Sequence, residues 1–100
     1  MTSTATKITL TKPIKAHNDE VTELTFRPMT GEDVIEIGAA PFQVDQKERT
    51  HMDFGILALY IARLANIPPS SVKMMAPADL LQSFGVVSGF FGDTGPTQKK

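Results

Sequence analysis

The sequence predicts an α+β fold that is mainly helical: an N-terminal β-hairpin followed by three to four α-helices, with a disordered C-terminal tail. Apolar residues alternate with period two in the first quarter of the chain, and they recur in steps of three and four in its second half. The last nine residues contain no apolar side chain except that of Pro96. We therefore expect one small domain over residues 1–91, with a hairpin over 7–27, a helical body over 31–91 and a disordered tail over 92–100.

The predicted hairpin has two strands that follow a frayed start over Met1 to Thr6. Its apolar positions are Ile8, Leu10, Ile14, Leu24 and Phe26. The segment from Ala16 to Glu20 contains Asn and Asp, which tolerate left-handed backbone, so we expect an antiparallel pair joined by a loop of four or five residues. Pro13 cannot donate a ladder hydrogen bond and suits an edge. A lone hairpin is marginally stable in water, so Leu10, Leu24 and Phe26 are expected to pack on a helix.

A short helix is predicted after Pro28. The hydroxyl of Thr30 can cap it, and Gly38 to Pro41 should end it. Residues 43–49 are highly charged and lack an apolar stripe, so we expect a loop or a solvated lead-in to the next helix. Thr50, with an aspartate three residues later, is the expected cap of that helix, although a start as early as Asp45 remains open.

The central helix is predicted over residues 52–67, and it is apolar on nearly every side. One stripe contains Met52, Ile56, Leu59, Tyr60, Arg63, Leu64 and Ile67, and a second contains Phe54, Leu57 and Ile61. A helix with this pattern needs cover on both sides. It is shorter than the ~20 apolar residues that span a bilayer, so we expect the cover to be protein and not membrane.

Two prolines after Asn66 end the central helix, and residues 69–74 can form one or two helical turns. Pro77 then opens a last helix. Its apolar stripe of Leu80, Phe84, Val87 and Phe91 is expected to pack on the central helix.

Composition argues against several classes of function. A net charge of −1 lacks the basic field that nucleic-acid binding requires, and the absence of cysteine excludes disulfides and thiolate metal sites. The two histidines, His17 and His51, sit in a predicted turn and at a predicted helix start, so no metal site is expected. No nucleophile or phosphate-binding motif is present, so we expect neither an enzyme nor a cofactor. The amino end does not resemble a signal peptide, and the protein is expected to stay inside the cell that makes it.

The remaining apolar surface suggests a partner, which we expect to include a second copy of the chain. The candidate partner-binding residues are Leu57, Ile61, Met74, Met75, Val86 and Phe90. The alternative for each is an ordinary core position, since methionines and two-sided helices are more often core than interface.

Four segments resemble one known family. They are Lys12-Pro13-Ile14, Val21 to Asp33, Ile61 to Pro68, and Asp79 at the opening of the last helix. Their order and spacing, from Lys7 to Phe91, resemble those of the tail assembly chaperones of contractile-tailed bacteriophages. Two features depart from the family: Ser70-Ser71 stands where members often carry an acidic pair, and residues 43–49 cannot be aligned.

The resemblance implies a non-enzymatic protein of the host cytoplasm that binds the phage tape measure protein and keeps it soluble while the tail tube protein polymerises around it. Such a protein would be absent from the finished virion. The alternatives are a structural or adaptor component of the tail, and a small nucleic-acid-binding regulator.

Members of this family are often made in two forms, the longer by a programmed frameshift near the end of the gene. Gln98-Lys99-Lys100 and Gly89-Phe90-Phe91 are the candidate slippage sites in this sequence. A longer form would be a further partner of the short one. In the longer form, the flexible linker from Gly92 to Gln98 would connect the domain to the extra segment.

Overall fold

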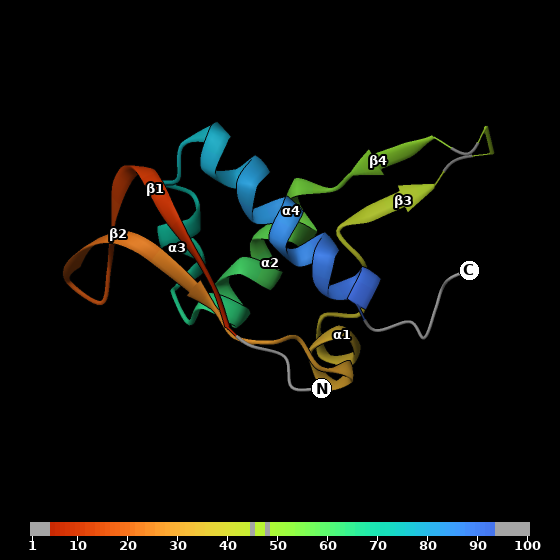
Figure 1. Cartoon of the computed structure of the whole chain (residues 1–100), viewed down its shortest axis with the longest axis horizontal. Helices are drawn as coiled ribbons and strands as arrows, with labels where there is room; N and C mark the ends of the chain where they lie inside the picture. Colours follow the sequence, from red (N-terminus) through yellow and green to blue (C-terminus); the bar gives the residue numbers. More distant parts are fainter. Residues whose placement is uncertain (1–4, 45, 48, 94–100) are drawn as a thin grey trace.

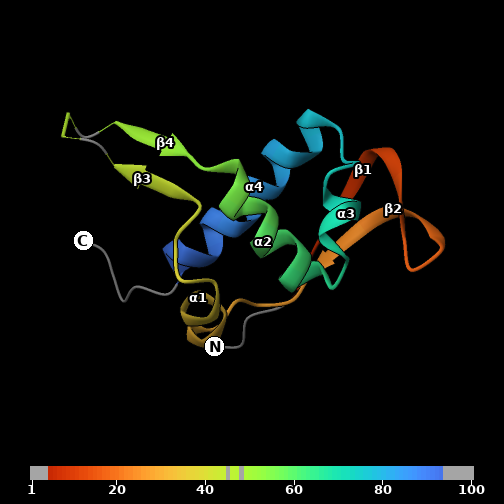
Figure 2. The ribbon, with the colours of Figure 1, turned by 180° about the vertical axis from the view of Figure 1, so that it is seen from behind.

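The computed structural model describes residues 5–44, 46–47 and 49–93. In chain order their elements are β1 (Thr6–Ala16), β2 (Asp19–Phe26), α1 (Gly31–Ile37), β3 (Phe42–Val44), β4 (Thr50–Met52), α2 (Phe54–Ala65), α3 (Pro69–Val72) and α4 (Pro77–Asp93). Helices α2 and α4 form the body, with the β1–β2 hairpin at one end and the β3–β4 hairpin projecting from the other (Figures 1 and 2). The predicted α+β class, with a hairpin followed by helices, is confirmed. The tail was predicted over residues 92–100, but α4 continues to Asp93, so the first two residues of that range are helical. The rest of the predicted tail, residues 94–100, and residues 1–4 lie outside the described residues.

The turn of the first hairpin is shorter than predicted. Ala16 pairs with Asp19, so only His17 and Asn18 connect the strands. Both have positive φ, 55° and 68°, which is the geometry of a type I′ turn and matches the right-handed twist of the strands. The imidazole Nε2 of His17 lies 3.0 Å from the backbone oxygen of Asn66, at the end of α2. The turn is thereby tied to the helical body.

Strand β1 contains a large bulge. Thr9 pairs with Glu23 and Ile14 pairs with Val21, so four residues of β1 oppose Thr22 alone. Pro13 lies in this bulge, where its missing N–H interrupts no ladder bond. The bulge leaves the backbone amides of Thr11 and Lys12 outside the ladder with β2, and both donate to the carboxylate of Asp79 in α4.

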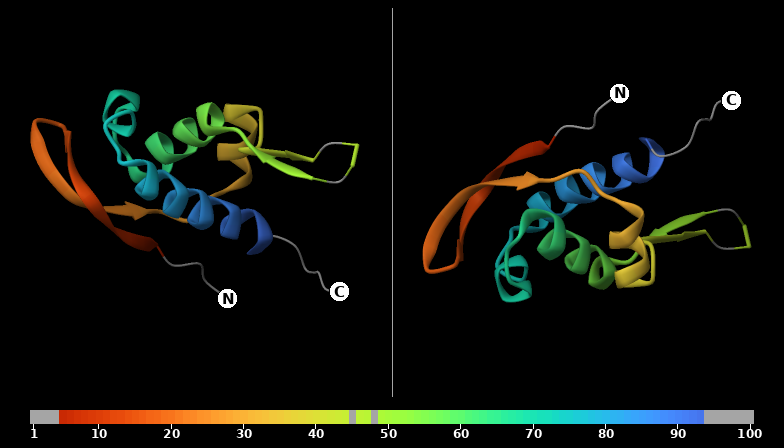
Figure 3. Two further views of the ribbon diagram at one scale, coloured as in Figure 1. Left: turned by 90° about the horizontal axis from the view of Figure 1, so that it is seen from above. Right: turned by 90° about the horizontal axis from the view of Figure 1, so that it is seen from below.

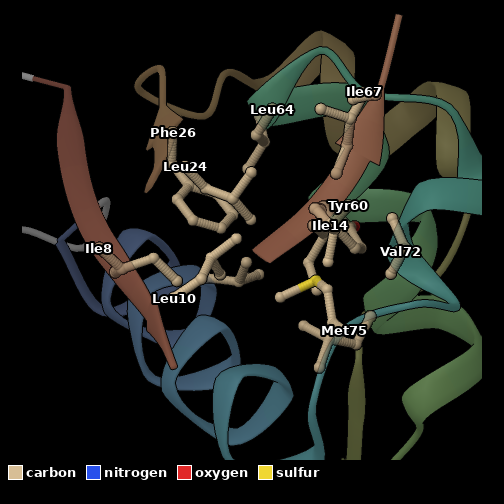
Figure 4. Close-up of a cluster of buried hydrophobic side chains, with 14 residues drawn as sticks. Ile8, Leu10, Ile14, Leu24, Phe26, Tyr60, Leu64, Ile67, Val72 and Met75 are labelled. Carbon is tan, nitrogen blue, oxygen red and sulfur yellow. The ribbon is translucent and has the colours of Figure 1, made fainter. Parts of the chain in front are cut away.

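The core lies between the hairpin and the helices (Figure 4). Leu10, Leu24 and Phe26 are buried there, as predicted. In the α4 stripe Val87 is fully buried, and the other three members are half-buried and pack against the core. The ring of Phe91 meets Tyr60 of α2 edge to face, with centroids 5.7 Å apart. Large buried side chains at the centre of the core include Leu24, Phe26, Leu57, Tyr60, Ile61, Val72 and Val87.

Helix α1 begins and ends as predicted. Thr30 and Asp33 form a capping box, in which each side chain accepts a hydrogen bond from the backbone amide of the other residue. Gly38 ends the helix with φ 84°, and its amide donates to the carbonyl oxygen of Val34 at 2.8 Å.

The second hairpin was not predicted. Strands β3 and β4 pair antiparallel, with Phe42 opposite Met52 and Gln43 opposite His51, so residues 43–49 are not simply a loop or helical lead-in. Figure 3 shows this hairpin extending from the body. Thr50 belongs to β4, and the expected cap at Thr50 is wrong: Asp53 caps α2, its carboxylate accepting from the amide of Ile56 at 3.1 Å. The alternative start at Asp45 falls on a residue outside the described ones.

Helix α2 ends at a left-handed residue. Asn66 has φ 58°, and its amide donates to the carbonyl oxygen of Ala62. The proline pair after it starts α3, a short helix whose Ser71 hydroxyl donates to the backbone oxygen of Lys15 in β1. None of the described helices has both the length and the apolar character needed to cross a bilayer.

Candidate interaction surface

Half of the predicted partner-binding residues are core residues. Leu57 and Ile61 are fully buried, and Met75 is 6% exposed. The structure thus places these three side chains in the core of the chain, and their contact with a partner stays an untested prediction. The reason for the burial of Leu57 and Ile61 lies in the rotation of α2, which turns Leu57, Tyr60, Ile61 and Leu64 inward together.

The other predicted partner-binding residues reach the surface to different extents. Met74, between α3 and α4, is 46% exposed. Val86 and Phe90 of α4 are half-buried and pack against the core, so only part of each side chain is available. Their contact with a partner stays a prediction.

Other large apolar side chains are exposed among the described residues. The largest exposed fractions belong to Ile35 of α1, at 78%, and Leu81 of α4, at 51%. Phe54 and Leu59 of α2 follow, each at 44%. The sequence indicated that some apolar side chains of α2 would be exposed, because the central helix is apolar on nearly every side. Ile35 was missed, although a seven-residue helix carrying Val34, Ile35 and Ile37 cannot turn all three inward.

Ile35 lines an apolar groove between α1 and the end of α4. The groove has a volume of about 470 Å³ and is lined by Met29, Thr30, Gly31, Val34, Ile35 and Phe91. One wall of the groove is Phe91. Its ring packs edge to face against Phe42 of β3 and Tyr60 of α2, with ring centroids 5.3 Å and 5.7 Å apart. We call this the α1–α4 groove. Since α1 and α4 are both fixed on the rest of the chain, the groove is already formed in the free protein.

A second apolar depression lies where α2 and α4 begin. It measures about 270 Å³ and is lined by Phe54, Pro77, Leu80 and Leu81. We call this the α2–α4 groove. Both grooves thus expose apolar side chains of helices whose other sides make the core.

A charged cluster fixes α1 on the body. The buried carboxylate of Asp33 accepts two hydrogen bonds from Arg27, at 2.7 and 2.8 Å, and one from Nε of Arg63 in α2 at 2.5 Å. It also accepts from the amide and the hydroxyl of Thr30. This set of bonds positions the helix that carries Ile35.

The same bonds set the protonation of the cluster. Hydrogen bonds from Arg27 hold the pKa of Asp33 well below its ordinary value, against the effect of burial, and those from Arg63 and Thr30 add to the lowering. The bond to Asp33 also raises the pKa of Arg27. Nearby, burial and the charge of Asp33 raise the pKa of Tyr60, whose hydroxyl donates to the backbone oxygen of Ala39. The carboxylate therefore serves as a structural anchor, because its oxygens are occupied by donors.

No cluster in the described part of the chain has the composition of a metal site: no group of three or more His, Asp or Glu side chains comes together there. His17 bonds to α2 through Asn66, and His51 lies in β4, so the fold places the two histidines on different elements.

Comparison with known proteins decides the family. The family model described as "Phage tail assembly chaperone proteins, E, or 41 or 14" matches residues 7–92. The chain belongs to this family. No curated protein sequence and no solved structure matches the chain significantly. The resemblance drawn from the sequence is thus confirmed, and family membership gives this tail assembly chaperone a role in phage tail assembly.

Ser71, one of the two serines noted in the sequence, has a structural role in this chaperone. Ser71 is 2% exposed, and its hydroxyl donates a hydrogen bond to the backbone oxygen of Lys15. A carboxylate at this position has no proton to donate at neutral pH and would bring a negative charge against that oxygen. Serine therefore suits the contact between α3 and β1 in this chain.

Proposed function

We propose that this tail assembly chaperone binds the phage tape measure protein and keeps it soluble while tail tube subunits assemble around it. Family membership supports the general role. The observation that carries the specific proposal is the apolar α1–α4 groove, which is bordered by Ile35, the most exposed large apolar residue among those described. Such a surface can cover apolar stretches of a long helical client that would otherwise associate with each other.

The proposed binding is mainly hydrophobic. The chaperone has a net charge of −1, so long-range attraction contributes little, and affinity must come from removing apolar area from water. The complex should therefore survive a rise in ionic strength. A nucleic-acid-binding regulator would behave differently, because each phosphate contact makes binding weaker as salt rises.

Co-expression tests the proposal. The tape measure gene of the same phage is expressed alone and together with this chaperone, and the soluble fraction and the co-purified chaperone are measured. We expect the tape measure protein to become soluble and to carry the chaperone through purification in high salt. An insoluble tape measure protein, despite abundant folded chaperone, would contradict the proposal.

The proposal places the chaperone in the host cytoplasm and outside the finished particle. A structural or adaptor component of the tail would instead remain in the particle. Mass spectrometry of purified virions separates these two functions, with peptides of the chain expected to be absent.

Additional partners remain part of the proposal. Self-association, contact with the tail tube protein and a longer frameshifted form would each increase the number of chaperone surfaces along one client. Light scattering measures the first. The nucleotide sequence decides the last, since the absence of a slippery run at residues 89–91 and 98–100, or of an open overlapping frame, would exclude it.

A further inference from the structure

We propose that the α1–α4 groove binds the apolar face of a short amphipathic helix, with lysine or arginine side chains of that helix lying over Glu32 and Glu36. This inference rests on the proposed function and names the surface that contacts the tape measure protein. Three properties of the groove support it: its apolar lining, its rigid wall and its acidic rim.

The lining explains the apolar side of the contact. Ile35 is the most exposed large apolar residue among those described, and it borders the larger of the two described grooves. Phe91 forms the opposite wall and is fixed by its ring contacts with Phe42 and Tyr60. A partner that buries Ile35 here gains hydrophobic free energy without having to order the wall.

The rim explains the charge of the partner. In a helix each residue is rotated by about 100° from the one before, which puts Glu32 about 60° and Glu36 about 100° from Ile35, on the side opposite to Val34. The two glutamates therefore form an acidic rim beyond Ile35, next to the residues that line the groove and not among them. Both glutamates are exposed, and the last turn of α1 carries no basic residue. Arg27 donates its hydrogen bonds to Asp33, and its charge also interacts with that of Glu32, so Glu36 is the rim carboxylate farther along the helix from this pair. A helix with basic residues beside its apolar stripe is therefore complementary to this surface.

The geometry favours a helix over the other occupants. The lining residues come from α1, the turn before it and α4, and none of them belongs to a strand that could pair with an extended peptide. The chain's own residues 94–100 contain only polar side chains besides Pro96, so they cannot supply the apolar face. A second copy would bring its own acidic rim toward the first.

The test compares two matched substitutions in the co-expression assay. Ile35→Gln removes the apolar side chain from the α1–α4 groove, and Leu81→Gln does the same in the α2–α4 groove. Both residues are exposed in helices, so the fold should persist, and circular dichroism with a urea titration checks this. We expect Ile35→Gln to reduce the co-purified tape measure protein by about tenfold and Leu81→Gln to leave it near the wild-type amount.

Each result has one meaning. If the wild-type chaperone fails to solubilise the tape measure protein, the proposed function fails. If the wild type succeeds and Ile35→Gln succeeds equally, the proposed function stands and the groove assignment is overturned. Equal loss with both substitutions also overturns the assignment to this groove alone.

A photo-crosslinking residue at position 35 identifies the occupant. We expect crosslinks to a tape measure segment with apolar residues at helical spacing and adjacent lysines or arginines. Crosslinks to residues 94–100 or to a second chaperone copy, without tape measure peptides, would overturn the inference.

The rim is tested with the crosslinked segment made as a peptide. The double variant Glu32→Gln/Glu36→Gln should bind it roughly three- to tenfold more weakly at low salt and with less salt dependence than the wild type. Unchanged affinity would contradict the predicted basic flank.

Discussion

The carboxylate of Asp79, in the first turn of α4, accepts hydrogen bonds from the backbone amide of Thr11 at 3.0 Å and from its hydroxyl at 3.2 Å. The amide of Lys12 lies 3.4 Å from the same carboxylate. These amides belong to the bulge of β1 and have no partner in β2. Asp79, itself fully buried, thus takes the place of the missing strand partner and fixes the start of α4 on the hairpin.

Replacing Asp79 should loosen this junction. Asp79→Ala leaves the amides of Thr11 and Lys12 without an acceptor, and we expect a loss of about 2–3 kcal/mol of unfolding free energy. Asp79→Asn keeps one acceptor oxygen and should lose less. Urea unfolding measures both, with exposed Asp19→Asn as the control. Equal stability of the Asp79→Ala variant and the wild type would show that water satisfies the bulge.

Removing the carboxylate of Asp33 should destabilise the α1 anchor in a pH-dependent way. At pH 7 we expect Asp33→Asn to lose about 2–4 kcal/mol, less than for a fully buried pair because Arg27 and Arg63 are partly hydrated. The pKa of Asp33 is lowered in the folded state. Its contribution is therefore complete above its unfolded pKa of about 4 and is lost as the pH falls below that value.

The measurement for Asp33 is urea unfolding at pH 7 and pH 3. The difference between wild type and Asp33→Asn should narrow at pH 3, because part of the wild-type contribution is already lost. A constant difference at both values would show that the charge of Asp33 is not what stabilises the anchor.

Two leucines of α2 test the rotation of the central helix. Leu57 is fully buried and Leu59 is 44% exposed. Leu57→Ala should therefore cost about 2–5 kcal/mol of unfolding free energy, whereas Leu59→Ala should change it by at most about 1 kcal/mol. The reverse order in chemical denaturation would mean that the two faces of α2 are interchanged.

The turn of the first hairpin gives a test of backbone geometry. Asn18 has φ 68°, a conformation that glycine adopts freely and a β-branched residue adopts poorly. Asn18→Gly should leave the free energy of unfolding unchanged or raise it slightly. Asn18→Val should lower the free energy of unfolding by about 1–2 kcal/mol. Thermal unfolding followed by circular dichroism compares them. Tolerance of valine would show that the turn does not require left-handed residues.

The long, periodic segments were predictable from sequence. The stripe that contains Leu80, Phe84 and Val87 predicts helix α4, but it marks the buried side only in part, because Val86 and Phe90 outside the stripe are half-buried as well. The pattern of α2 does not identify a buried side. Leu57 and Leu59 are equally apolar, and only the packing of Tyr60 and Ile61 under the hairpin decides which one faces inward.

Short elements and distant polar pairs escaped prediction for different reasons. Strands β3 and β4 have three residues each, too few for a period of two to stand out. Asp33 and Asp79 both lie in first turns of helices, where an acidic residue is ordinary. Their roles depend on partners that folding brings close: Arg63 for Asp33, and Thr11 for Asp79.

The bond between Asp79 and Thr11 also bears on the order of folding. It joins residues separated by 68 positions, so it can form only after a long loop has closed, at an entropic cost that local turns do not carry. The hairpin and α2 can form early from neighbouring residues, but the β1 bulge keeps exposed amides until α4 arrives. Docking of α4 should therefore be a late step of refolding, and Asp79→Ala should raise the unfolding rate far more than it lowers the folding rate. A newly made chain would then reach its native core only when its last helix becomes available.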